Sequence, residues 1–154
     1  MNNLQLIYAM KQDQYISKFN CKVCSLDEIS SLSLPIENYM IIYNTKNFPH
    51  SGHWCLMHRK EQRVPVTFDS FGDTPQHIVA SFLIETSPNQ KYIKNSLQVQ
   101  DYSMTTCGFY VLYLAYHLAR GLNLTEILSI FKGKPLLYIE SYVVSFVKTH
   151  FSLH

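Results

Sequence analysis

Residues 104–113 read Met104-Thr105-Thr106-Cys107-Gly108-Phe109-Tyr110-Val111-Leu112-Tyr113, a polar pair of threonines that leads into a long apolar segment. Thr105 or Thr106 can act as the N-cap of a helix that begins at about Cys107 and ends near Gly121. The segment is too apolar all round for a surface helix. The stretch therefore predicts a central, buried helix around which the rest of the chain is arranged.

The position of Cys107 in the first turn of that helix favours an ionised thiol. Free backbone N–H groups and the positive end of the helix dipole both favour an anion there. The thiolate is the nucleophilic form of cysteine, and the missing side chain of Gly108 would let a substrate backbone approach closely. The alternative is a small hydrophobic cysteine packed at the start of a core helix.

Length and composition indicate one domain, residues 1–154, of ordinary globular character: 47% of the residues are hydrophobic and 16% are charged. Four cysteines are too few for a secreted disulfide scaffold of this length. We see no signal peptide, and the apolar segment Phe109 to Ala119 is too short to span a bilayer. These features predict an intracellular monomer without membrane contact, and a net charge of +2 is compatible with a weak DNA contact but does not require one.

Two apolar segments in the first half of the chain predict a β-hairpin beside a buried strand. Residues 39–43 form a short apolar run typical of a buried strand. Residues 52–58 and 66–71 follow a loop at 44–52 and are joined by a charged turn. Alternation places His53, Cys55 and Met57 on one face and Trp54, Leu56 and His58 on the other. The hairpin brings His53 and Asp69 to the same edge of the sheet.

The remaining segments predict helices at 3–19 (one or two), 75–85, 125–131 and from Pro135 onward, and a strand at 92–100. Together the elements predict an α+β fold. A central mixed or antiparallel β-sheet packs against a buried helix with the nucleophilic cysteine at its N-terminus, and further helices flank it.

Two groups of residues offer weak metal patterns. Cys21 and Cys24 are spaced as in half a zinc ribbon, but no second pair follows, so we interpret them as loop or core cysteines. His50, His53, Cys55 and His58 are close in sequence, but strand alternation separates His53 from His58. We therefore predict no metal site, and take His50, His58 and His77 as surface imidazoles.

Cysteine-based acyl transfer needs a base, a carboxylate that orients the base, and donors for the oxyanion. His53 follows a glycine at the mouth of a strand, and Asp69 lies in an otherwise apolar strand, where an unpaired carboxylate would be costly. Gln100 closes a strand shortly before Cys107, and Gln98 on the same strand face competes for its role. The candidates thus occur in the order His, Asp, Gln, Cys.

That order, with Gly-His-Trp, Phe-Asp-Ser-Phe-Gly and Gln-x6-Cys-Gly-x-Tyr, resembles the adenovirus-type cysteine endopeptidases (the adenain family). These belong to the clan of the SUMO- and ubiquitin-like-specific proteases, a variant of the papain-like architecture. The resemblance implies His53 as general base, Asp69 as its orienting acid and Cys107 as nucleophile. It also implies Gln100 as the oxyanion-hole side chain, with Trp54 and Gly108 beside the substrate.

The resemblance further implies cleavage after small residues such as glycine, in viral or mobile-element precursor proteins, within the host nucleus or the virion. No cofactor is expected. Adenovirus enzymes are activated by DNA and by a disulfide-linked peptide, but residues 87–92 contain no cysteine for such a link. The alternatives are a SUMO or ubiquitin-like deconjugating protease, an acyltransferase on the same scaffold, and an inactive adaptor that binds peptide or nucleic acid.

Overall fold

The computed structural model describes residues 1–33, 35–46 and 52–153. Its centre is a five-stranded sheet whose order follows the chain: β1 (Asn20–Ser25), β2 (Asn38–Asn44), β3 (Trp54–Lys60), β4 (Val66–Phe68) and β5 (Ile93–Lys94). β2, β3 and β4 are antiparallel, whereas β1 lies parallel to β2 and β5 parallel to β4. The α+β fold class with a mixed sheet is therefore confirmed.

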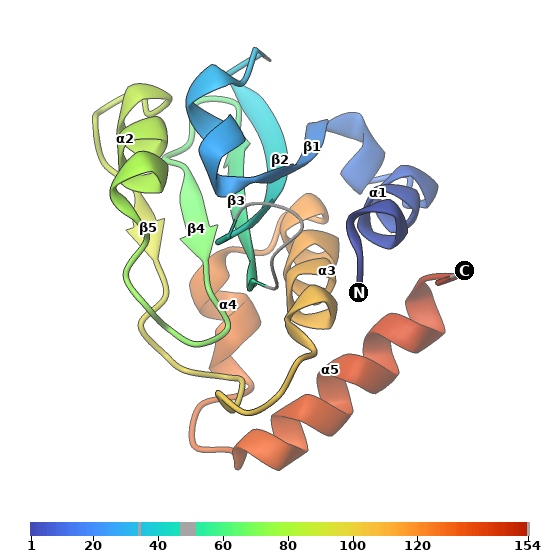
Figure 1. Cartoon of the computed structure of the whole chain (residues 1–154). Coiled ribbons are helices and arrows are strands. Elements are labelled where there is room, and N and C mark those ends of the chain that lie inside the picture. The colour runs from blue at the N-terminus through green and yellow to red at the C-terminus, as the bar shows by residue number, and fades with distance from the viewer. Residues whose placement is uncertain (34, 47–51, 154) are drawn as a thin grey trace.

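The helices cover both faces of this sheet: α1 (Asn3–Gln12), α2 (His77–Glu85), α3 (Cys107–Ala119), α4 (Leu124–Ser129) and α5 (Leu136–His150), with 3-10 helices η1 (Ile16–Lys18) and η2 (Leu26–Ser31). Figure 1 shows α3 between the sheet and α5, and α2 on the other side of the sheet. Nine of the thirteen residues of α3 are buried, as its apolar composition predicts.

Side-chain alternation along β3 divides the interior into two apolar clusters. Trp54 and Leu56 belong to the cluster around α3, whereas Cys55 and Met57 pack with α2 and η2. Because successive side chains of a strand point to opposite faces, this split follows from the sequence. The predicted hairpin of β3 and β4 is confirmed by their antiparallel register, in which Leu56 opposes Phe68.

Three predicted segments differ from the structure. Residues 20–25, where we predicted no strand and interpreted Cys21 and Cys24 as loop or core cysteines, form the edge strand β1, whose exposed Cys21 and Lys22 weaken the apolar pattern of a strand. The predicted strands 66–71 and 92–100 shorten to β4 and β5. The reason lies in Asn95: its side chain accepts a hydrogen bond from the Asp69 N–H (3.0 Å) and donates one to the Asp69 carbonyl (2.7 Å), which replaces a ladder partner.

Most of the predicted loop 44–52 lies outside the described residues. Among the residues that are described, no helix is long and apolar enough to cross a membrane.

Candidate active site

Cys107 is the first residue of α3 and is almost fully buried. Its Sγ accepts a hydrogen bond from the backbone N–H of Trp54 at 3.3 Å. Thr106, one of the two predicted N-caps, occupies the N-cap position, but its hydroxyl donates to the carboxylate of Glu140 on α5 instead of capping the helix. The Thr106 side chain therefore does not compete with the thiol for the N–H groups of the first turn of α3.

The hairpin of β3 and β4 brings His53 and Asp69 together. The Nε2 atom of His53 lies 2.8 Å from Oδ1 of Asp69, and both side chains are largely buried. The same oxygen accepts the backbone N–H of Phe71 at 2.8 Å, while the Phe71 ring stacks on the imidazole with centroids 4.1 Å apart and 9° between the planes. The backbone N–H of His53 donates to the hydroxyl of Thr45. Contacts on several sides thus hold the imidazole in one orientation.

The contact between the thiol and the imidazole shifts the pKa of each group toward its charged form. Burial raises the pKa of Cys107, but its hydrogen bond with His53, the Trp54 N–H and the positive charge of His53 outweigh that effect, and the pKa lies below its ordinary value. Burial likewise lowers the pKa of His53, but hydrogen bonds with Asp69, Cys107 and Cys55 outweigh it, and this pKa is raised. A thiolate beside an imidazolium is the nucleophilic state that acyl transfer requires.

Gln100 is fully buried and lies beside the residue that precedes the nucleophile. Its Nε2 donates to the carbonyl of Met104 at 3.1 Å and makes a longer contact of 3.5 Å with Oγ1 of Thr106. The amide of Gln98 instead donates to the backbone carbonyl of Gln100 at 2.8 Å. Of the two glutamines, the geometry therefore favours Gln100 as the side chain that could reach a developing oxyanion.

The structure places Met1 next to both predicted substrate-binding residues. The indole N–H of Trp54, which is buried, donates to the Met1 carbonyl at 2.9 Å. Gly108 is also buried, and a Cβ added there would lie 2.8 Å from Cβ of Met1. The space beside Gly108 is thus filled by the N-terminal segment of the same chain, not left open for a substrate backbone as we expected.

Cys55 also contacts the candidate active site, although the sequence analysis assigned it no catalytic role. It lies on the same face of β3 as His53 and is hydrogen-bonded with His53 and Tyr43, and burial raises its pKa to about 11. The ligand atoms of His53, Cys55 and Asp69 lie within 4.8 Å of one another. A structural zinc site needs four ligands, and the raised pKa opposes the thiolate form that binds metal. These three residues therefore fit a metal ion poorly.

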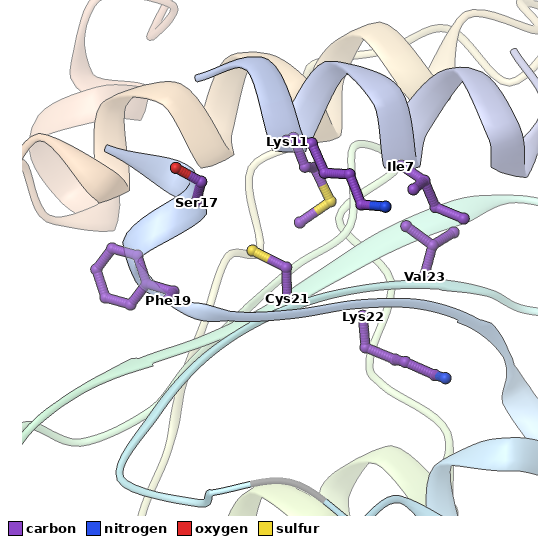
Figure 2. Close-up of a pocket in the computed structure, with 8 residues that line it drawn as sticks. Ile7, Lys11, Ser17, Phe19, Cys21, Lys22 and Val23 are labelled. Carbon is purple, nitrogen blue, oxygen red and sulfur yellow. The ribbon is translucent and has the colours of Figure 1, made fainter. Parts of the chain in front are cut away.

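The other histidines and cysteines of the weak metal patterns that the structure describes do not converge on this site. His58 is buried, not exposed as predicted: its Nδ1 lies 3.0 Å from the Tyr39 carbonyl and burial lowers its pKa to about 4. His50 lies outside the described residues. The thiol of Cys21 donates to the Ile16 carbonyl and lines a separate pocket between α1 and β1 (Figure 2), whereas Cys24 is buried on the opposite face of the sheet.

Three residues that the sequence pattern did not single out complete the site: Ser70, Phe71 and Asn95. Ser70 and Phe71 directly follow Asp69, so their place in the Asp-Ser-Phe-Gly segment could have indicated that they belong to the site. Asn95 had no such signal, because it contacts the backbone of Asp69 from 26 positions away.

Comparison with known proteins rests on structure alone. No protein-family model matches the chain, and no curated protein matches it in sequence. Two solved structures of the ASFV pS273R protease are similar. One has a TM-score of 0.58 and 14% identity over 79% of this chain; the other, a selenomethionine form, has a TM-score of 0.60 and 16% identity over 84%.

The chain shares its α+β fold with these two protease structures. It spans about three fifths of the length of the proteases that it matches, 60% and 61%. No sequence match supports the adenain family in particular. At this level of identity the likeness concerns the fold, and the chemistry has to be argued from the side chains of the site.

Proposed function

We propose that this protein is a cysteine endopeptidase. The observation that carries the proposal is the convergence of Cys107, His53 and Asp69, with the Trp54 N–H on the sulfur and the Asp69 carboxylate on the imidazole. The fold that the chain shares with the ASFV pS273R protease supports the same reading.

The reaction proceeds through an acyl-enzyme. The Cys107 thiolate attacks a peptide carbonyl carbon, so that a C–S bond forms and the carbonyl π electrons move to oxygen. The N–H of Cys107 and the amide of Gln100 stabilise that oxyanion. The imidazolium of His53 gives its proton to the leaving amine as the C–N bond breaks. His53 then takes a proton from water, whose oxygen attacks the thioester and releases the acid and the thiolate.

Asp69 bonds to Nε2 of His53 and so leaves Nδ1 to exchange the proton with the thiol and the leaving group. This role orients the base and favours its charged form. For the substrate we propose precursor polypeptides, of viral or mobile-element origin, cut after small residues such as glycine.

The proposal is tested with Gly-Gly and Gly-Ala peptides and with the purified full chain. We expect cleavage by the parent and by Cys21→Ser, which removes an exposed thiol on the edge strand β1. Cys107→Ala should abolish turnover, and His53→Ala should remove most of it while the circular-dichroism spectrum stays unchanged. Cleavage by Cys107→Ala at the parental rate would refute the proposal.

A second assay separates maturation of precursors from deconjugation. Ubiquitin-like vinyl-sulfone probes should leave Cys107 unlabelled if the protein cleaves precursor chains. Labelling of Cys107 by such a probe would instead assign the protein to the deconjugating proteases, with the same chemistry at the same residues.

A further inference from the structure

Ser70 links the two sides of the candidate active site. It directly follows Asp69, is fully buried, and its hydroxyl donates a short hydrogen bond to Oε1 of Gln100. Its carbonyl accepts the backbone N–H groups of Val99 (2.9 Å) and Gln100 (3.0 Å). Both the backbone and the side chain of Gln100 are therefore held by the residue next to the acid.

These contacts decide which way the Gln100 amide points. A primary amide that rotates by half a turn exchanges its oxygen with its nitrogen, and with them its acceptor and donor roles. The Ser70 hydroxyl holds the oxygen, and the Met104 carbonyl accepts one N–H at 3.1 Å. Among the described residues, the second N–H has only the 3.5 Å contact with Thr106, whose hydroxyl is itself directed to Glu140. That weakly held N–H is the one that a stronger acceptor can capture.

We propose that Ser70 is a positioning residue that keeps an N–H of Gln100 turned toward the oxyanion formed at Cys107, an inference that rests on the proposed function. Without the hydroxyl, the amide oxygen loses its donor and the rotated amide becomes accessible. The rotated amide would present oxygen to the oxyanion, and like charges repel. The segment Asp69–Phe71 thus orients the base through Asp69 and the oxyanion donor through Ser70.

A double-mutant cycle tests the assignment. Ser70→Ala, Gln100→Ala and the double variant are compared with the parent in peptide hydrolysis, with Ser103→Ala, an exposed serine outside the site, as the matched control. Ser70→Ala should lower kcat by about 10- to 100-fold with little change in KM, since one oxyanion donor is misplaced. In the Gln100→Ala background the same change should have almost no further effect.

The alkylation rate of Cys107 with iodoacetamide distinguishes a positioning role from a merely structural one, because structural damage at the site would change this rate. Alkylation needs the thiolate but no oxyanion hole, so Ser70→Ala should react at the parental rate. Ser70→Thr, which keeps the hydroxyl, should recover most of kcat.

Three results would overturn the assignment. The first is that the fold-losses in kcat of the two single variants multiply in the double variant. The others are that the alkylation rate of Ser70→Ala falls in parallel with kcat, or that Ser70→Thr is as slow as Ser70→Ala. If the parent is alkylated but shows no Cys107-dependent cleavage, the proposed function fails and the role of Ser70 fails with it. If the parent does cleave but the fold-losses of the two single variants multiply in the double variant, the role of Ser70 alone is refuted.

Discussion

Replacing His53 by alanine should shift the pH at which Cys107 ionises. The variant loses the hydrogen bond and the positive charge that lower the pKa of the thiol, but it keeps the burial that raises it. The Trp54 N–H remains as a weaker stabiliser of the thiolate. We therefore expect the pKa of Cys107 to return to its ordinary value or to rise above it.

The size of the effect follows from the thiolate population. At pH 6.5 a cysteine with an ordinary pKa of about 8.5 is only about 1% ionised. The thiol of the parent has a lowered pKa and is therefore ionised to a larger extent at this pH. If the thiol of His53→Ala returns to the ordinary pKa, its thiolate population falls by at most about 100-fold. A thiolate of lower pKa is less nucleophilic, which reduces the expected loss in alkylation rate to about tenfold.

The two pKa shifts widen the pH range of the charged pair in opposite directions. The lowered pKa of Cys107 extends it toward acid pH, and the raised pKa of His53 extends it toward alkaline pH. As pH falls, the parent keeps its thiolate down to the lowered pKa of Cys107, whereas the variant loses it already near the ordinary thiol pKa. As pH rises, the raised pKa of His53 keeps the imidazolium, and with it the proton for the leaving amine, into the alkaline range.

The assay is alkylation of the Cys107 peptide by iodoacetamide, followed by mass spectrometry between about pH 5 and 9, where ordinary and activated thiols differ. His77→Ala, which changes an exposed histidine on α2, serves as the control. Work in a Cys21→Ser background removes the exposed thiol. If the profiles of the parent and of His53→Ala superimpose, no ion pair exists and the mechanism above is wrong.

Three further changes are informative. Asp69→Asn should lower kcat less than loss of the imidazole, because Asp69 orients but does not react; peptide hydrolysis at the parental rate would remove it from the site. Glu140→Ala leaves the Thr106 hydroxyl without its acceptor and should lower the free energy of unfolding by about 1–3 kcal/mol in urea denaturation; an unchanged midpoint would contradict this. Gly108→Ala forces Met1 to move and should destabilise the protein by about 1–3 kcal/mol and speed limited proteolysis of the N-terminal segment. Parental stability and cleavage would show that the segment yields freely.

Local pattern was sufficient for the elements with clear periodicity. The apolar run at 39–43 predicted the buried strand β2, and the alternation from His53 to His58 predicted the two faces of β3. It was insufficient for the edge strand β1 and for the end of β4. β1 carries a polar composition because its outer edge is exposed, and β4 stops at Phe68 because a side chain takes over the backbone pairing of Asp69.

The sequence by itself determined the α+β class, the burial of α3 and the order of the candidate residues His53, Asp69, Gln100 and Cys107. These follow from periodicity, capping and residue chemistry over a few neighbouring positions. Only the tertiary structure decided that Ser70 holds Gln100, that Asn95 holds Asp69 and that Met1 fills the space beside Gly108. Such contacts join residues 26 to 107 positions apart, and their geometry depends on how whole elements pack, which no local pattern encodes.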